Sequence, residues 1–96
     1  MKTKFLHLRR KINNTIQSTG GMTIAYIIDD DYHVIGFAPA RCHINDTYNK
    51  KQGRVKAEGR LKSDKYFVQV KKQKEQEFIQ ECHDMYAKLE EELFRQ

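Results

Sequence analysis

The sequence predicts an α+β domain in the order helix, β-hairpin, helix, short strand and long C-terminal amphipathic helix. Three observations lead to this class. Two β-prone runs flank an aspartate-rich turn in residues 22–42, a heavily charged helical segment follows, and apolar residues recur at helical spacing near the C-terminus. With 96 residues, 39% of them hydrophobic, and one proline, the chain is expected to form a single domain over residues 1–96.

The first segment carries apolar residues three or four positions apart: Phe5, Leu8, Ile12 and Ile16. This spacing predicts an amphipathic helix over residues 3–17, although the stretch KFLHLR would also suit a strand. The glycines of STGG, residues 18–21, are expected to end the helix, because glycine readily adopts the left-handed conformation that follows helices.

The next two runs, MTIAYIID and HVIGFAPARC, are rich in β-branched and aromatic residues and are separated by DDDY. They predict a β-hairpin, because aspartate side chains bond the local backbone in turns. Gly36 in the second run indicates a bulge or a close backbone approach. Pro39 has no N–H to donate to a neighbouring strand, so it is expected at a sheet edge or at the strand's end.

HIND then leads into a helix predicted over residues 47–62, with Asn45 or Asp46 as its N-cap. KYFVQV predicts a third strand at about residues 65–70, which would join the hairpin's sheet or pair across a dimer. The last helix is expected to start near Lys72. Its apolar stripe consists of Ile79, Cys82, Tyr86, Leu89 and Leu93, widened by Phe78 and Met85.

Charge is distributed in blocks along the chain. The net charge is +5, and the predicted isoelectric point is about 9.3. Residues 1–20 and 47–72 are strongly basic, whereas residues 21–46 and 73–96 are acidic overall. This pattern favours one basic surface for an anionic partner and a separate acidic helix, although a solvated charged face would give a similar pattern.

The predicted helix over residues 47–62 contains the main candidate binding residues. Arg54 and Arg60 come first, because a guanidinium can bind phosphate through two parallel hydrogen bonds and lysine cannot. Lys50, Lys51 and Lys56 are the next candidates for contact with phosphate.

The same helix contains two glycines, each of which costs roughly 1 kcal/mol relative to alanine in a helix. Gly53 and Ala57 share one helix face, while Gly59 lies on a neighbouring face. Small residues would let the helix pack closely on a sheet, or would let a ligand or nucleic-acid backbone approach closely. The sequence leaves both interpretations open.

A second basic patch consists of His7 and the cluster Arg9, Arg10 and Lys11. If it lay beside the helix of residues 47–62, the two would form one continuous phosphate-facing surface. Three aromatic residues would either stack against bases or belong to the core: Tyr48, Tyr66 and Phe67.

Other chemistry has little support in the sequence. Cys42 and Cys82 are expected to be free thiols, and the histidine after each cysteine would point elsewhere, so no metal site is expected. Asp residues 29–31 fit a solvated turn, or an acidic lure for a basic host protein. Paired carboxylates, a nucleophile motif and a glycine-rich phosphate loop are all missing, so we expect no enzyme, catalytic residue or cofactor. No apolar run is long enough for a membrane span, and no signal peptide is evident, so a cytoplasmic location is expected.

The stretches GGMTIAY and ARCHINDTYNKKQGRVKAEGRL, within roughly residues 20–61, resemble a pattern that recurs in small phage-encoded accessory proteins. In that pattern GGMTIAY precedes a strand ending in Ala-x-Cys, and an Asp-x-aromatic pair opens a helix carrying Gly, Ala and Arg. The matching positions are Ala40, Cys42, Asp46, Tyr48, Gly53, Ala57 and Arg60. The resemblance implies a host-takeover or anti-defence role, and some phage anti-defence proteins, such as those opposing the Thoeris system, sequester a nucleotide signal.

The expected function is therefore a non-enzymatic phage-type inhibitor in the host cytoplasm. Its basic face would engage a phosphate-bearing partner, which is a nucleic acid, a ribonucleoprotein or a nucleotide signal. The alternative is an inhibitor that binds a host defence protein through the hairpin edge and the acidic last helix. The long amphipathic helix also suggests a homodimer or higher homo-oligomer.

Overall fold

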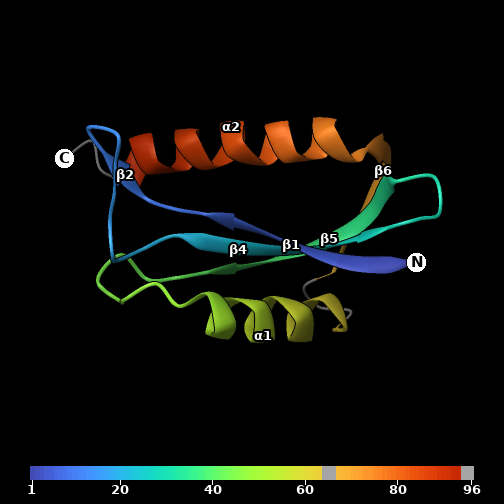
Figure 1. Cartoon of the computed structure of the whole chain (residues 1–96), viewed down its shortest axis with the longest axis horizontal. Helices are drawn as coiled ribbons and strands as arrows, with labels where there is room; N and C mark the ends of the chain where they lie inside the picture. The colour runs from blue at the N-terminus through green and yellow to red at the C-terminus, as the bar shows by residue number, and fades with distance from the viewer. Residues whose placement is uncertain (64–66, 94–96) are drawn as a thin grey trace.

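The computed structural model describes residues 1–63 and 67–93, and consists of two helices on opposite faces of an antiparallel sheet (Figure 1). The sheet has four strands in the order β1-β4-β5-β6, and a separate two-stranded ribbon pairs β2 with β3. The α+β class is thereby confirmed. In chain order the elements are β1 Lys2–Leu8, β2 Lys11–Ile12, β3 Thr15–Ile16, β4 Met22–Ile28, β5 His33–Arg41, α1 Lys50–Leu61, β6 Val68–Lys74 and α2 Glu75–Leu93.

The prediction of a helix over residues 3–17 is wrong, because this segment forms β1 and the small β2–β3 hairpin. β1 pairs along its whole length with β4, so that its side chains alternate between the two faces of the sheet. Asn13 and Asn14 both adopt positive φ, at 51° and 65°, which is the backbone geometry that tight hairpin turns need. Gly20 and Gly21 also have positive φ, but they lead into β4 and do not end a helix.

The predicted β-hairpin is confirmed as β4 and β5. Gly36 fulfils both expectations, because the β5–β6 register shifts between Val34 and Gly36, and a side chain at Gly36 would collide with the Phe67 ring. Pro39 lies in the part of β5 that extends beyond its described pairing with β6, so its missing N–H costs no bond there.

The sheet face under α1 is lined by small residues. A Cβ atom on Gly53 would overlap the Thr23 hydroxyl and lie 3.0 Å from Thr23 Cβ, so only glycine permits this approach of α1 to β4. Fully or nearly fully buried residues complete this core: Ala25, Ala38, Ala40, Ala57 and Leu61, with Phe5, Ile27 and Phe67 packed around them. Phe67 is therefore a core residue, whereas Tyr66 lies outside the described residues.

The opposite face of the sheet carries larger side chains and is covered by α2. Its buried residues are Leu8, Met22, Ile24, Tyr26, Ile28, Val34, Phe78 and Cys82, and Tyr86 packs against them. The Tyr26 and Phe37 rings each lie within 5.4 Å of the Phe78 ring, centroid to centroid. The predicted stripe of the last helix thus centres on Phe78 and Cys82, while Met85 at its margin remains 42% exposed.

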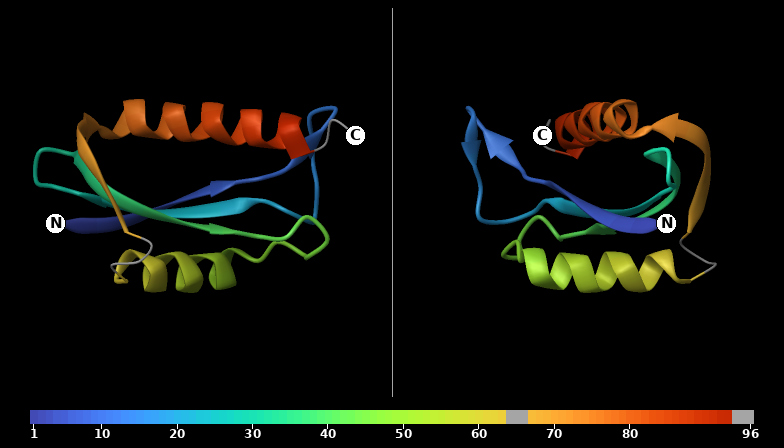
Figure 2. Two further views of the ribbon diagram at one scale, coloured as in Figure 1. Left: turned by 180° about the vertical axis from the view of Figure 1, so that it is seen from behind. Right: turned by 45° about the vertical axis from the view of Figure 1, so that its right-hand side comes forward.

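The third strand joins the hairpin's own sheet, because β6 pairs antiparallel with β5. It runs on to Lys74, which is why α2 begins at Glu75 and not near Lys72. Figure 2 shows β6 climbing from the α1 side of the sheet to the α2 side. Glu75 is fixed there by Lys4 Nζ at 2.8 Å and by the Tyr26 hydroxyl, which donates a hydrogen bond of 2.8 Å.

The aspartate turn between β4 and β5 is a structural element of the sheet. Asp29 accepts hydrogen bonds from the backbone N–H groups of Asp31 and His33, at 2.9 and 3.0 Å. Its other carboxylate oxygen lies 2.9 Å from Lys72 Nζ on β6. Neither described helix is both long and apolar enough to cross a membrane.

Candidate nucleic-acid interface

Helix α1 begins three residues later than predicted and has a different cap. Asn49, not Asn45 or Asp46, is the N-cap, and its side chain accepts a hydrogen bond of 3.0 Å from the backbone N–H of Gln52. The helix carries one acidic residue, Glu58, which pairs with Lys62 at 3.1 Å. Its five basic residues are Lys50, Lys51, Arg54, Lys56 and Arg60, and all but Arg60 are exposed.

A polar cluster connects β1, β4 and the start of α1. His7 Nδ1 lies 2.7 Å from the Tyr48 hydroxyl and 3.0 Å from the Thr23 hydroxyl, and these two hydroxyls are 2.8 Å apart. The Arg9 guanidinium lies 4.5 Å from the centre of the Tyr48 ring, in cation–π geometry. Gly21 makes room for this ring, because a Cβ there would lie 2.7 Å from Tyr48 Cδ2.

This cluster joins part of the N-terminal basic patch, His7 and Arg9, to the start of α1, whereas Arg10 of that patch lies elsewhere. Burial lowers the pKa of His7 below its usual value of 6.5, and the positive charges of Lys50, Arg54 and Arg9 lower it further, in that order. His7 is thus neutral near pH 7, and three cations lie close enough to disfavour its protonation. The three cations Arg9, Lys50 and Arg54 therefore lie around the neutral His7 between β1 and α1, and we call this group the β1-side flank.

The other side of α1 faces β5. Arg60 Nη1 donates a hydrogen bond of 3.1 Å to the Pro39 carbonyl, which holds its guanidinium beside β5. Lys56 lines a hollow of about 270 Å³ that opens between α1, the end of β5 and the loop between them. The remaining lining residues are Thr23, Ala40, Arg41, Cys42, His43, Asp46, Thr47, Tyr48, Asn49, Gln52 and Gly53. Lys56 and Arg60 form what we call the β5-side flank.

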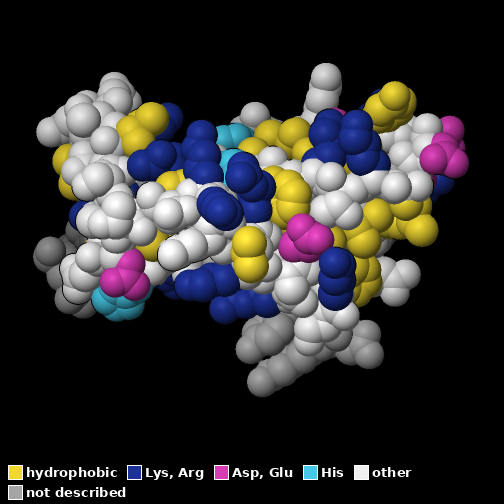
Figure 3. All heavy atoms as spheres, turned by 60° about the horizontal axis from the view of Figure 1, so that its bottom comes forward, with side chains coloured by type: hydrophobic (Ala, Val, Ile, Leu, Met, Phe, Trp, Pro, Cys, Tyr) yellow, Lys and Arg dark blue, Asp and Glu magenta, His cyan; other side chains and the backbone are white. Residues whose placement is uncertain are grey.

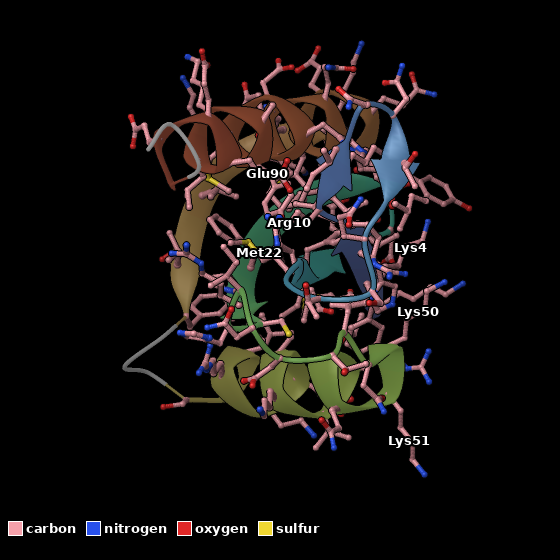
Figure 4. All side chains as sticks on the ribbon, turned by 90° about the vertical axis from the view of Figure 1, so that its left-hand side faces the viewer. Lys4, Arg10, Met22, Lys50, Lys51 and Glu90 are labelled. Carbon is pink, nitrogen blue, oxygen red and sulfur yellow. The ribbon has the colours of Figure 1, made fainter. Side chains whose placement is uncertain are left out.

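Other predicted site residues have different places. Arg10, in the link between β1 and β2, lies between the sheet and α2, beside Glu90, whereas Lys50 and Lys51 point outward at the start of α1 (Figure 4). Gly53 and Ala57 both face the sheet, where they allow α1 to pack closely. Tyr48 is half-buried, with one side against Gly21 and its ring under Arg9.

Lys and Arg side chains gather on the face that α1 covers, both above and below a small hydrophobic patch in the view of Figure 3.

Sequence reasoning missed Thr23, which is completely buried and orders the polar cluster. It also missed the Asn49 cap, although asparagine followed three residues later by glutamine resembles a capping box.

The cysteines are both free thiols, as expected. Burial raises the pKa of Cys82 to about 11, with a smaller contribution from Glu81. Cys42 is half-buried, and its Sγ atom lies 3.4 Å from the Asp46 carbonyl. Within residues 1–63 and 67–93, no group of three or more His, Cys, Asp or Glu side chains could hold a metal ion.

Comparisons with protein-family models, with curated proteins and with solved structures found no match to this chain.

Proposed function

We propose that this chain binds a phosphate-bearing partner through the basic face of α1, without catalysing a reaction. The observation that carries the proposal is the β1-side flank, in which Arg9, Lys50 and Arg54 converge on the neutral His7. Blocking a host or defence process in the host cytoplasm, as the phage resemblance implies, would follow from such binding.

Electrostatics supports an anionic partner. Like charges gathered on one face repel one another, and the only acid of α1 is already paired with Lys62. A bound phosphate would relieve this repulsion and would accept charge-assisted hydrogen bonds from the arginines. The aromatic ring of Tyr48 under Arg9 keeps that guanidinium in a fixed position without neutralising it.

The test is a titration of fluorescently labelled DNA oligonucleotides and labelled ATP by anisotropy over a range of salt concentrations. We expect binding that weakens with salt, and an affinity reduced in the double variant Lys50→Gln, Arg54→Gln. The matched control is Lys71→Gln, Lys88→Gln, which removes two exposed lysines from β6 and α2. The proposal fails if no probe binds, or if the two double variants weaken binding equally.

A second candidate is a protein–protein inhibitor that uses the outer face of α2. There, exposed Met85 lies in a shallow groove with the acidic residues Glu81, Asp84 and Glu92, which suits a basic protein partner. The hairpin edge supports this candidate less, because β4 lies between β1 and β5, and β6 pairs with β5 as far as Phe37. Binding to a purified basic host protein that survives nuclease treatment and is lost in Met85→Glu would favour this candidate.

A further inference from the structure

Helix α1 is positively charged along both of its sides. Lys50 and Arg54 lie on the side of α1 that faces His7 of β1, close enough to lower its pKa. Lys56 and Arg60 contact the β5 side, through the hollow and the Pro39 carbonyl. The two flanks therefore run parallel to one another, separated by the width of one helix.

Between the flanks, the outermost side of α1 is exposed and carries Lys51, Val55 and Gly59. Val55 is 66% exposed, and Lys51 beside it is also exposed. Gly59 has no neighbouring atom within 4 Å of where a Cβ would be, so packing inside the protein does not explain this glycine. The views in Figures 1 and 2 show α1 as the outer layer of the molecule, with its far side facing away from the sheet.

We infer that α1 enters the major groove of duplex DNA, with its two flanks on the two phosphate backbones and its outermost side toward the base pairs. This inference rests on the proposed function and names its partner. A helix with its side chains is roughly 10–12 Å across, and the major groove of B-DNA is about 12 Å wide. A partner with phosphates on both sides of the helix uses both flanks at once.

The outermost side of α1 is suited to this groove. Gly59 would let the helix backbone approach the base edges, which is a general use of glycine at contacts with a ligand. Val55 would make apolar contacts, of the kind that thymine methyl groups provide, and Lys51 can donate to guanine acceptors. Contact with the base edges would explain why α1 has a glycine at position 59 despite its cost in a helix. At position 53, close packing on Thr23 explains the glycine.

Other phosphate-bearing partners would contact fewer of the residues on the two flanks and the outermost side of α1. A nucleotide in the hollow of about 270 Å³ would engage Lys56 but not the β1-side flank. Duplex RNA has a major groove too deep and narrow for side chains to read. Single strands are bound through stacking on exposed aromatic rings, whereas Phe67 is packed in the core and Tyr48 is covered by Gly21 and Arg9.

The first experiment measures anisotropy with a short DNA duplex, an RNA duplex of the same sequence, the DNA single strand and ATP. We expect the DNA duplex to bind at least tenfold more tightly than the others, which is about 1.4 kcal/mol. About four phosphate contacts give a slope near −3.6, so affinity should fall roughly 150-fold between about 50 and about 200 mM salt. Equal or tighter binding of RNA, single strand or ATP overturns the inference but leaves the phosphate-binding proposal intact, whereas no binding of any probe overturns both.

The second experiment tests the outermost side of α1 directly. Gly59→Leu adds a bulky side chain in open space, so the protein should fold at least as stably, and thermal melts will check this. We expect it to weaken duplex binding roughly tenfold or more, because the helix can no longer approach the bases. The matched control is Ala87→Leu, at an exposed position of α2, and it should leave binding unchanged. Wild-type duplex affinity in folded Gly59→Leu overturns the inference.

Discussion

Alanine substitutions at the two glycines of α1 should have opposite effects on stability. In a helix, alanine is more favourable than glycine by roughly 1 kcal/mol, and this term is common to both sites. At Gly59 the new methyl group enters open space, so Gly59→Ala should stabilise the protein by up to about 1 kcal/mol.

At Gly53 the same methyl group would overlap the hydroxyl of the fully buried Thr23. Overpacking of this kind costs about 1–3 kcal/mol. Moving the Thr23 hydroxyl would also weaken its contacts with His7 and Tyr48, at about 1 kcal/mol each. After subtraction of the helix-propensity gain, Gly53→Ala should destabilise the protein by about 3 kcal/mol, which lowers the Tm by roughly 12–24 °C for a domain of this size.

Urea-induced equilibrium unfolding followed by circular dichroism will measure both variants against the wild type. The double variant Gly53→Ala, Thr23→Ala provides a control, because removing the hydroxyl should reduce the cost of the alanine at residue 53. If Gly53→Ala were as stabilising as Gly59→Ala, the close packing of α1 on β4 would be refuted.

Three further predictions concern titration and reactivity. The backbone hydrogen bonds of the turn and then Lys72 lower the pKa of Asp29 from 3.8 to about 2, so its stabilising effect is present above pH 4 and is lost as the pH falls toward 2. Asp29→Asn should therefore lower the Tm at pH 6 and flatten the decline of the Tm between pH 4 and pH 2, and an unchanged profile would contradict this. A thiol reagent at pH 8 should modify Cys42 in the native protein and Cys82 only after denaturation, since burial raises the pKa of Cys82 to about 11. In NMR titrations, His7 should have a pKa below 6.5 that rises when DNA binds, because phosphates offset the surrounding cations, and a pKa that does not change would place the DNA elsewhere.

Most of the fold could be predicted from the sequence, and the failure at the N-terminus has a physical reason. The apolar residues between Phe5 and Ile16 have helical spacing by coincidence, because β1 is covered by a helix on each side and both of its faces carry apolar residues. Phe5 contacts the α1 side while Leu6 and Leu8 contact the α2 side, so the period-two pattern is hidden. The Asn13-Asn14 pair was the available hairpin signal.

The basic residues of α1 could be predicted from the sequence, but their position relative to the basic residues of the N-terminal segment could not. On a helix, Arg9 and Arg10 would have been near neighbours on one surface. Instead they lie in the link between β1 and β2, where Arg9 lies on the Tyr48 ring and Arg10 lies near α2. The role of Thr23 depends on tertiary contacts from β1 and α1, which local sequence patterns do not encode.

The layer of alanine and glycine beneath α1 has a consequence for how this protein can change over generations. The inner side of the helix is held in register by close contacts such as Gly53 on Thr23, and substitutions there carry a large penalty. Lys51, Val55 and Gly59, on the outer side, are exposed and contribute little to packing. Mutation can therefore vary the outer side at nearly constant stability, so that the exposed surface of α1 can change quickly while the scaffold stays the same.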